Sequence, residues 1–255
     1  MRRVPLVLMA VVLGGGLAAF AVNRQSRAAP PLVVLVAASL RPVAEQVAAE
    51  YGGPVELRYG GSEELVAQIR LTADLAPADL FLPADASYLD ACGPHAAVTP
   101  PLATMRAVAL TRPDRVPEKL AALTAPGVRL GLASPQTAAI GKLTKLRLTE
   151  AGLWDTVSAR LAVTTDTVTQ SANGVKLGTL DAAIVWDATA RQFAPDLVGT
   201  PLPELSGVRA EVRAAVLSGS RRPDAAAAFL AFLAGDGGRR AFAAHGFAPP
   251  GGPSP

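Results

Sequence analysis

Short apolar segments alternate with segments of helical spacing along most of the chain. The apolar runs predict strands at 32–36, 55–59, 79–82, 106–110, 128–132, 181–186 and 209–217. Apolar residues three and four apart predict helices at 41–51, 63–71, 142–150, 171–177, 223–233 and 238–244. The segment 163–168 is either a connection or a short strand. Strands that alternate with helices are typical of an α/β fold with parallel sheets.

Two serines occupy equivalent strand-to-helix turns. Ser39 lies between the first strand and its helix, and Ser62 follows Gly60 and Gly61 in the next unit. Serine is favoured as the residue that caps a helix N-terminus, so both are candidate caps. The first N–H groups of a helix have no partner within the helix and bind anions without a basic side chain. Each serine is therefore a candidate helix cap, a candidate ligand contact, or both.

The first 29 residues have the pattern of a targeting segment and linker. A basic start precedes an uncharged run over 4–22, and Ala19-Phe20-Ala21 offers a small-residue cleavage site. This order predicts a secretory signal that is cleaved, with an uncleaved membrane anchor as the alternative. Both hypotheses place the remaining residues outside the cytoplasm.

Charge and cysteine content exclude several classes of protein. The formal net charge is +3, but the first 29 residues hold four arginines and no acidic residue, so the remainder is close to neutral. A nucleic-acid partner, which needs a clustered basic face, is therefore not expected. Cys92 is the single cysteine, and His95 and His245 lie in no motif, which argues against a zinc site. The chain also lacks the Gly-x-Ser-x-Gly turn of many serine hydrolases.

Several ordered stretches resemble the periplasmic molybdate-binding proteins of ABC importers, the ModA-like group with a type II periplasmic-binding-protein fold. They cover most of the chain beyond residue 29. The stretches are Val36 to Leu40, Gly61 to Ile69, Ala76 to Asp85, Gly152 to Asp155, Ala182 to Trp186 and Ala241 to Phe247.

The resemblance implies a two-lobed α/β fold in which each lobe is a mainly parallel sheet flanked by helices. Two crossover strands near Val108 and Val212 would join the lobes. Lobe one would comprise 30–107 plus 212–250, and lobe two 108–211. We expect a disordered tail at 251–255.

The same resemblance implies a set of ligand-binding residues in the cleft between the lobes. Ser39 and Ser62 match the two serines of the family, and the Ile140 backbone matches an amide donor. The next amide falls on Val168 if one residue is inserted before it, and otherwise on Thr167. Where the family has a tyrosine hydroxyl, this chain has Trp186, followed by Asp187. Trp186 is a departure from the family pattern, since an indole N–H donates with a different reach.

The implied function is that of a monomeric periplasmic binding protein that delivers molybdate or tungstate to an ABC permease in the inner membrane. It would be no enzyme, need no cofactor and hold its metal as an oxyanion, without direct metal ligands. A site of neutral donors would disfavour protonated phosphate, which must also donate a hydrogen bond. Alternatives are the same fold with sulfate, phosphate or another small anion, an exported serine hydrolase, and a membrane-tethered sensor.

Overall fold

A computed structural model describes residues 30–73, 75 and 78–251. The predicted leader at 1–29 lies outside the described residues, as does the predicted tail apart from Gly251. Among the described helices, none has the length and apolar character that a membrane crossing requires.

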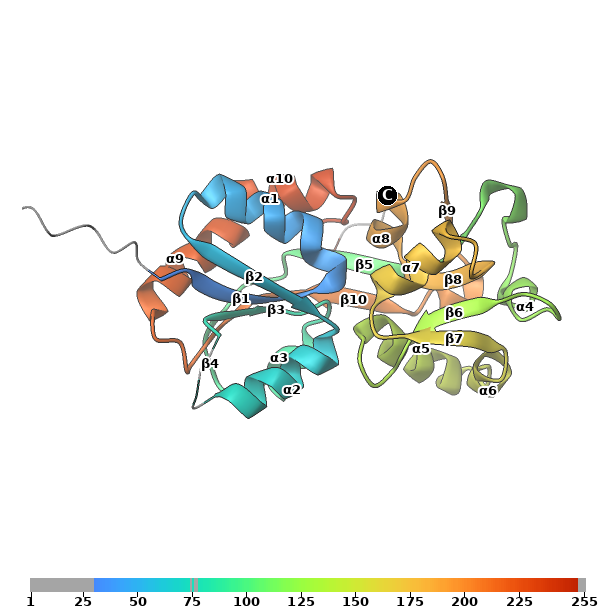
Figure 1. The fold of residues 1–255 in the computed structure, drawn as a ribbon, viewed down its shortest axis with the longest axis horizontal. Coiled ribbons are helices and arrows are strands. Elements are labelled where there is room, and N and C mark those ends of the chain that lie inside the picture. The colour runs from blue at the N-terminus through green and yellow to red at the C-terminus, as the bar shows by residue number, and fades with distance from the viewer. Residues whose placement is uncertain (1–29, 74, 76–77, 252–255) are drawn as a thin grey trace, which may run out of the picture. The chain divides into compact units, whose positions relative to one another are not determined.

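The first of two sheets contains the strands predicted nearest the N-terminus (Figure 1). Strand β1 pairs in parallel with β2 and β3, whereas β11 pairs antiparallel with β3 and β4. In spatial order, this sheet consists of β2 (Val55–Gly60), β1 (Leu32–Ala37), β3 (Leu80–Leu82), β11 (Ala215–Leu217) and β4 (His95–Val98).

The second sheet is also mixed. Strand β6 pairs in parallel with β7 and β8, and β5 pairs antiparallel with β8, β9 and β10. In spatial order it consists of β10 (Arg209–Val212), β5 (Ala103–Thr111), β8 (Ala182–Trp186), β6 (Leu130–Ala133) and β7 (Leu161–Thr165), with β9 (Val198–Thr200) beside β5. The predicted α/β fold with two helix-flanked sheets is confirmed. The prediction that each sheet is mainly parallel is wrong, because the strands by which the chain passes between the sheets and returns, β5, β10 and β11, pair antiparallel with their neighbours.

The chain passes between the sheets along two adjacent antiparallel strands, β5 and β10 (Figure 1). The prediction of one return strand over 209–217 is wrong, because this segment forms two strands that are separated by Arg213 and Ala214. The first part, β10, pairs with β5 in the second sheet, and the second part, β11, pairs with β3 and β4 in the first. The break follows from this change of sheet.

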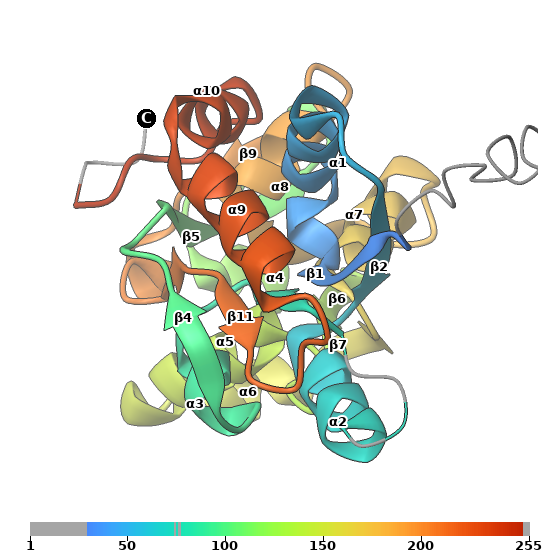
Figure 2. The same ribbon diagram turned by 90° about the vertical axis from the view of Figure 1, so that its left-hand side faces the viewer.

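Helices cover both faces of each sheet. Figure 2 shows α1, α9 and α10 on one face of the first sheet and α2 and α3 on the other. These helices are α1 (Arg41–Tyr51), α2 (Ser62–Thr72), α3 (Ser87–Ala91), α9 (Pro223–Ala234) and α10 (Asp236–Ala244). The second sheet is accompanied by α4 (Leu120–Leu123), α5 (Ala139–Glu150), α6 (Trp154–Ser158), α7 (Val168–Lys176) and α8 (Asp187–Gln192).

The central strands are buried because helices cover them on both sides. Every residue of β8 is buried, and so is every residue of β1 except Val33. Removing a Val, Leu or Ile side chain from water stabilises the fold by about 1.5–3 kcal/mol, so these strands fix the loops that follow them. The loops after β1, β2, β6 and β7 lead into 3-10 or α-helices, and the first residues of these helices line the cavity described below.

Candidate functional site

A small cavity of ≈ 20 Å³ lies where the loops of the two sheets meet. Both sheets contribute to its lining, and the described lining residues carry no charged side chain. The lining consists of Ala37, Ala38, Ser39, Gly60, Gly61, Ser62, Ala84, Ala138, Ala139, Ile140, Thr167, Val168 and Trp186. Six of the seven residues named from the sequence are therefore brought together here, and Asp187 is the exception.

Ser39 presents an unsatisfied hydroxyl to this cavity. It lies in a 3-10 helix, Ala38–Leu40, between β1 and α1, and its side chain is buried. Its Oγ has no hydrogen-bond partner among the described residues. The predicted capping role is wrong, because the residues that precede the 3-10 helix and α1 are Ala37 and Leu40.

Ser62 is held differently. It is the first residue of α2, and Gly61 is the residue that precedes the helix, so a cap by the Ser62 side chain is also wrong. Instead, Ser62 Oγ accepts a hydrogen bond of 3.1 Å from the Ala84 N–H, within the buried lining. Because this bond uses an oxygen lone pair, the Ser62 O–H remains a donor. Glu63 and Glu64 lie in the first turn of α2, as predicted.

Two helix N-termini face the serines from the second sheet. Ile140 is the second residue of α5, and Val168 is the first residue of α7. Amides at these positions have no acceptor within their own helices, and neither donates a hydrogen bond elsewhere in the described chain. Both helices start three residues earlier than the sequence pattern predicts, and these extra residues carry the two amides.

Thr167 also lines the cavity, but its backbone N–H is engaged. Its side-chain oxygen accepts from the Gln170 N–H at 3.3 Å, and its own N–H donates to Gln170 Oε1 at 3.2 Å. This reciprocal pair is a capping box at the start of α7. Of the two alternatives left open by the sequence, Val168 therefore has the available amide.

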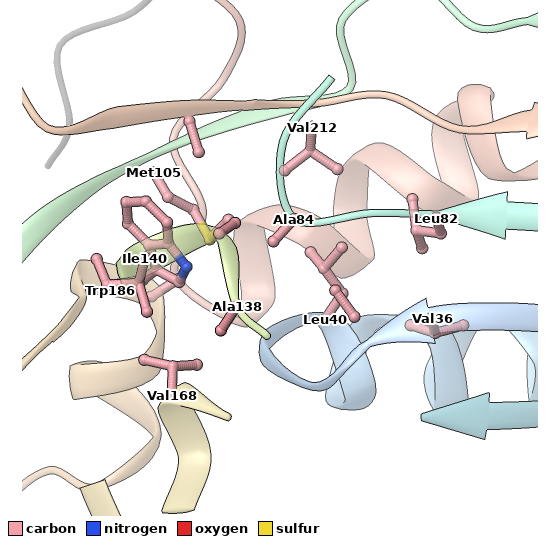
Figure 3. Packing of buried hydrophobic residues seen from close by; sticks show 14 of the residues in the cluster. Val36, Leu40, Leu82, Ala84, Met105, Ala138, Ile140, Val168, Trp186 and Val212 are labelled. Carbon is pink, nitrogen blue, oxygen red and sulfur yellow. The ribbon is translucent and has the colours of Figure 1, made fainter. Parts of the chain in front are cut away.

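Trp186 forms an apolar wall of the cavity. It is the last residue of β8 and its side chain is buried. Figure 3 shows the indole ring beside Ile140, with its nitrogen turned toward Ala138. An indole N–H can donate but not accept a hydrogen bond.

Asp187 does not line the cavity. It begins α8, and its carboxylate accepts a hydrogen bond from the Arg106 N–H at 3.2 Å and pairs with Arg106 Nε at 3.6 Å. These contacts join α8 to the crossover strand β5. The arrangement keeps a negative charge out of the cavity lining.

Sequence reasoning missed the contribution of Ala84. This residue follows β3, which pairs in parallel with β1, and the carboxyl ends of neighbouring parallel strands meet at one edge of a sheet. That rule could have placed the loop after β3 beside Ser39. In the described chain, no group of three or more His, Cys, Asp or Glu side chains is arranged to hold a metal ion.

Comparisons with known proteins agree with this architecture. A family model described as bacterial extracellular solute-binding protein matches residues 32–248. The molybdate-binding protein ModA of Mycobacterium tuberculosis is 30% identical over 237 residues, which cover 88% of this chain and 87% of that protein.

Two solved structures share the fold. The periplasmic molybdate-binding protein of Azotobacter vinelandii has a TM-score of 0.72 at 23% identity, over 86% of this chain and 99% of that chain. The sulfate-binding protein SubI of Mycobacterium tuberculosis has a TM-score of 0.72 at 18% identity, over 88% of each chain. Together with the family match and the 30% identity to ModA, these findings show that the chain belongs to the bacterial extracellular solute-binding protein family.

Proposed function

We propose that this protein is the extracytoplasmic binding component of an ABC importer and that it binds molybdate or tungstate in the cavity between its two sheets. The observation that carries the proposal is the set of unengaged neutral donors in a lining without charged side chains. Its relative ModA, 30% identical, is a molybdate-binding protein. The permease partner, the periplasmic location, the cleaved leader and a monomeric state belong to this proposal.

The proposed contacts come from both sides of the cavity. Ser39 Oγ and Ser62 Oγ donate from one side. The Ile140 and Val168 amides donate from the other, where the helix dipoles of α5 and α7 favour an anion. Trp186 closes the wall and offers its indole N–H. We leave Thr167 and Asp187 out of the ligand contacts, because the Thr167 N–H already donates to Gln170 and the Asp187 carboxylate already accepts from Arg106.

The absence of a carboxylate from the lining supports selection against protonated phosphate. A fully deprotonated oxyanion accepts every hydrogen bond, whereas hydrogen phosphate must also donate one. Backbone amides and an indole N–H cannot accept that hydrogen bond, so only the two serine hydroxyls, which are weaker acceptors than a carboxylate, remain for it. A carboxylate would accept it, and the nearest candidate of the sequence analysis, Asp187, is turned toward Arg106.

We also propose that the protein acts by binding and not by catalysis. A serine nucleophile needs a base within hydrogen-bond reach. His245 Nε2 instead lies 3.0 Å from Gln46 Oε1, and His95 is an exposed residue of β4. Neither histidine lines the cavity with Ser39 and Ser62.

The division into lobes is part of the proposal as well. Lobe one comprises 30–107 plus 212–250, and lobe two comprises 108–211. The proposed limits Val108 and Val212 fall in β5 and β10, the adjacent strands along which the chain passes between the sheets. Closure of the lobes around the anion would be a hinge motion at these strands.

Thermal unfolding of the purified protein tests the proposed ligand class. At about 1,000 times the dissociation constant, a ligand that binds the folded state alone stabilises it by about 4 kcal/mol. We expect molybdate and tungstate to raise the melting temperature, with much smaller effects of sulfate and phosphate at equal concentration. If neither millimolar molybdate nor millimolar tungstate raises the melting temperature, the proposed specificity is wrong.

A further inference from the structure

The rim of the cavity beside α2 brings the two proposed lobes into direct contact. The Glu63 N–H, in the first turn of α2, donates a hydrogen bond of 3.1 Å to the Thr137 carbonyl, which precedes α5. Gly61 packs against the same carbonyl: a Cβ at position 61 would lie 2.1 Å from Thr137 O and 3.1 Å from Asp166 O. This contact requires a residue without a side chain at position 61.

The backbone conformation of Gly61 does not by itself require glycine. Its φ of −70° and ψ of 148° are open to any residue. An alanine at this position would therefore fit lobe one alone and would collide with Thr137 of lobe two. The glycine is needed for the approach of the two lobes and not for the fold of either.

A charged cluster flanks this backbone contact. Lys142 Nζ, from α5, lies 3.9 Å from Glu63 Oε2 and 4.4 Å from the centre of the Tyr88 ring. Tyr88 belongs to α3 and is fully buried. Burial, reinforced by the charges of Glu63 and Asp85, raises the pKa of Tyr88 well above its ordinary value. The ring therefore stays neutral, and its face can attract the ammonium group.

We propose that Gly61, Glu63, Tyr88, Thr137 and Lys142 form a closure latch, which joins the lobes when the anion is bound and slows its release. The latch rests on the proposed function. The side chains of Glu63, Tyr88 and Lys142 are not among the residues that line the cavity, so they act on the ligand by stabilising the closed arrangement. A larger closed fraction raises the apparent affinity in proportion.

Substitution of Gly61 tests the backbone part of the latch. We expect Gly61→Ala to leave the melting temperature of the unliganded protein close to that of the wild type. The overlap with Thr137 should weaken molybdate binding by about tenfold or more, the range of overpacking effects. In small-angle X-ray scattering, molybdate should make the wild type more compact, and it should compact the variant to a smaller extent.

Gly207→Ala is the matched control for this substitution. A Cβ at position 207 would lie 3.7 Å from Arg147 Cδ, an ordinary contact, and Gly207 does not line the cavity. We expect this variant to bind and close like the wild type.

Substitution of Lys142 tests the charged part without altering the cavity lining. Lys142→Met keeps the apolar stem and removes the charge. Because an exposed ion pair of this kind contributes little, Lys142→Met should weaken molybdate binding by about twofold to fivefold. The loss should come from faster dissociation of the anion. The exchanged pair Lys142→Glu with Glu63→Lys should recover part of the loss, and high salt should reduce the difference. Lys145→Met is the control, because Lys145 on the same helix lies over Trp154, also of lobe two.

The outcomes separate the latch from the function on which it rests. Weaker binding and incomplete compaction in Gly61→Ala, with faster release in Lys142→Met, support the latch. If the wild type binds molybdate and closes while both variants bind, close and release like it, the latch is overturned and the proposed function stands. A wild type that closes on no tested anion overturns the proposed function and the latch with it.

Discussion

Ser39 and Ser62 look equivalent in the sequence but differ in their hydrogen bonds. Both are buried, yet Ser62 Oγ accepts from the Ala84 N–H and Ser39 Oγ has no partner in the described chain. A buried polar group without a partner costs about 1–3 kcal/mol. The unsatisfied hydroxyl of Ser39 is thus the residue-scale feature that a bound anion best explains.

This difference predicts opposite effects of two alanine substitutions on stability. Ser39→Ala should leave the free energy of unfolding unchanged or raise it slightly, because it removes an unsatisfied group. Ser62→Ala should lower it by about 1–3 kcal/mol, because the buried Ala84 N–H loses its acceptor. Urea denaturation of the two variants measures both effects.

The same two variants should behave alike in binding. A lost hydrogen bond to an ionised oxygen costs about 1.5–3 kcal/mol, so each should bind molybdate about tenfold to hundredfold more weakly. Ser39→Ala with wild-type affinity would contradict the assignment of its hydroxyl to the anion.

Asp181, the residue before β8, predicts a pH dependence of stability away from the cavity. Hydrogen bonds from the Arg129 side chain and backbone N–H hold the pKa of Asp181 far below its ordinary value. A depressed carboxyl pKa stabilises the fold above the unfolded-state pKa of about 3.9 and loses this effect as the pH falls toward the folded-state value. Asp181→Asn should therefore melt below the wild type at pH 7, and the gap should shrink in acid. A gap that is constant from pH 7 to pH 2 would rule out this origin.

At the scale of elements, the beginnings of α5 and α7 position the proposed amide donors. The sequence pattern finds both helices, but it predicts that each begins three residues late. For α7 a signal was present: Thr167 and Gln170 have the spacing of a capping box, and the structure contains that box. For α5 there was no such signal, since Ala138 precedes the helix and makes no side-chain cap.

The capping box predicts a distinct role for Thr167. Thr167→Ala should destabilise the protein by about 1 kcal/mol, because the Gln170 N–H loses its acceptor, whereas Thr167→Ser should keep the cap. Since the cap orients the Val168 amide, the alanine variant should also bind the anion more weakly. Chemical denaturation and titration of the pair provide the measurement. Equal stability of the alanine and serine variants would contradict a capping role.

At the scale of the whole molecule, the alternation of strands and helices was enough to predict an α/β fold, and the family resemblance implied two sheets, but neither predicted how the strands pair. The break at Arg213 and Ala214 depends on β11 joining the first sheet beside β3, a contact between residues distant in sequence. Trp186 and Asp187 show the same limit. Adjacent in sequence, they have opposite surroundings: one side chain lines the cavity and the other faces Arg106. Gly61 against Thr137 is a further contact that no local pattern could predict.

The molecule as a whole combines an uncharged cavity, five proposed neutral donors and proposed lobes that meet at a rim. Its parts belong together if a single tetrahedral oxyanion occupies the cavity. Each donor then acquires a partner, and the rim contacts form when the anion is enclosed.

Titration calorimetry of the purified protein with molybdate, repeated in the presence of excess sulfate and of excess phosphate, tests this central claim most directly. We predict that one molybdate binds per chain. Excess sulfate should lower the apparent affinity for molybdate only slightly. Excess phosphate should lower it even less, because protonated phosphate finds no carboxylate in the cavity. Tungstate should replace molybdate. No heat of binding with either metal oxyanion, or binding that sulfate or phosphate abolishes at comparable concentration, would contradict the account.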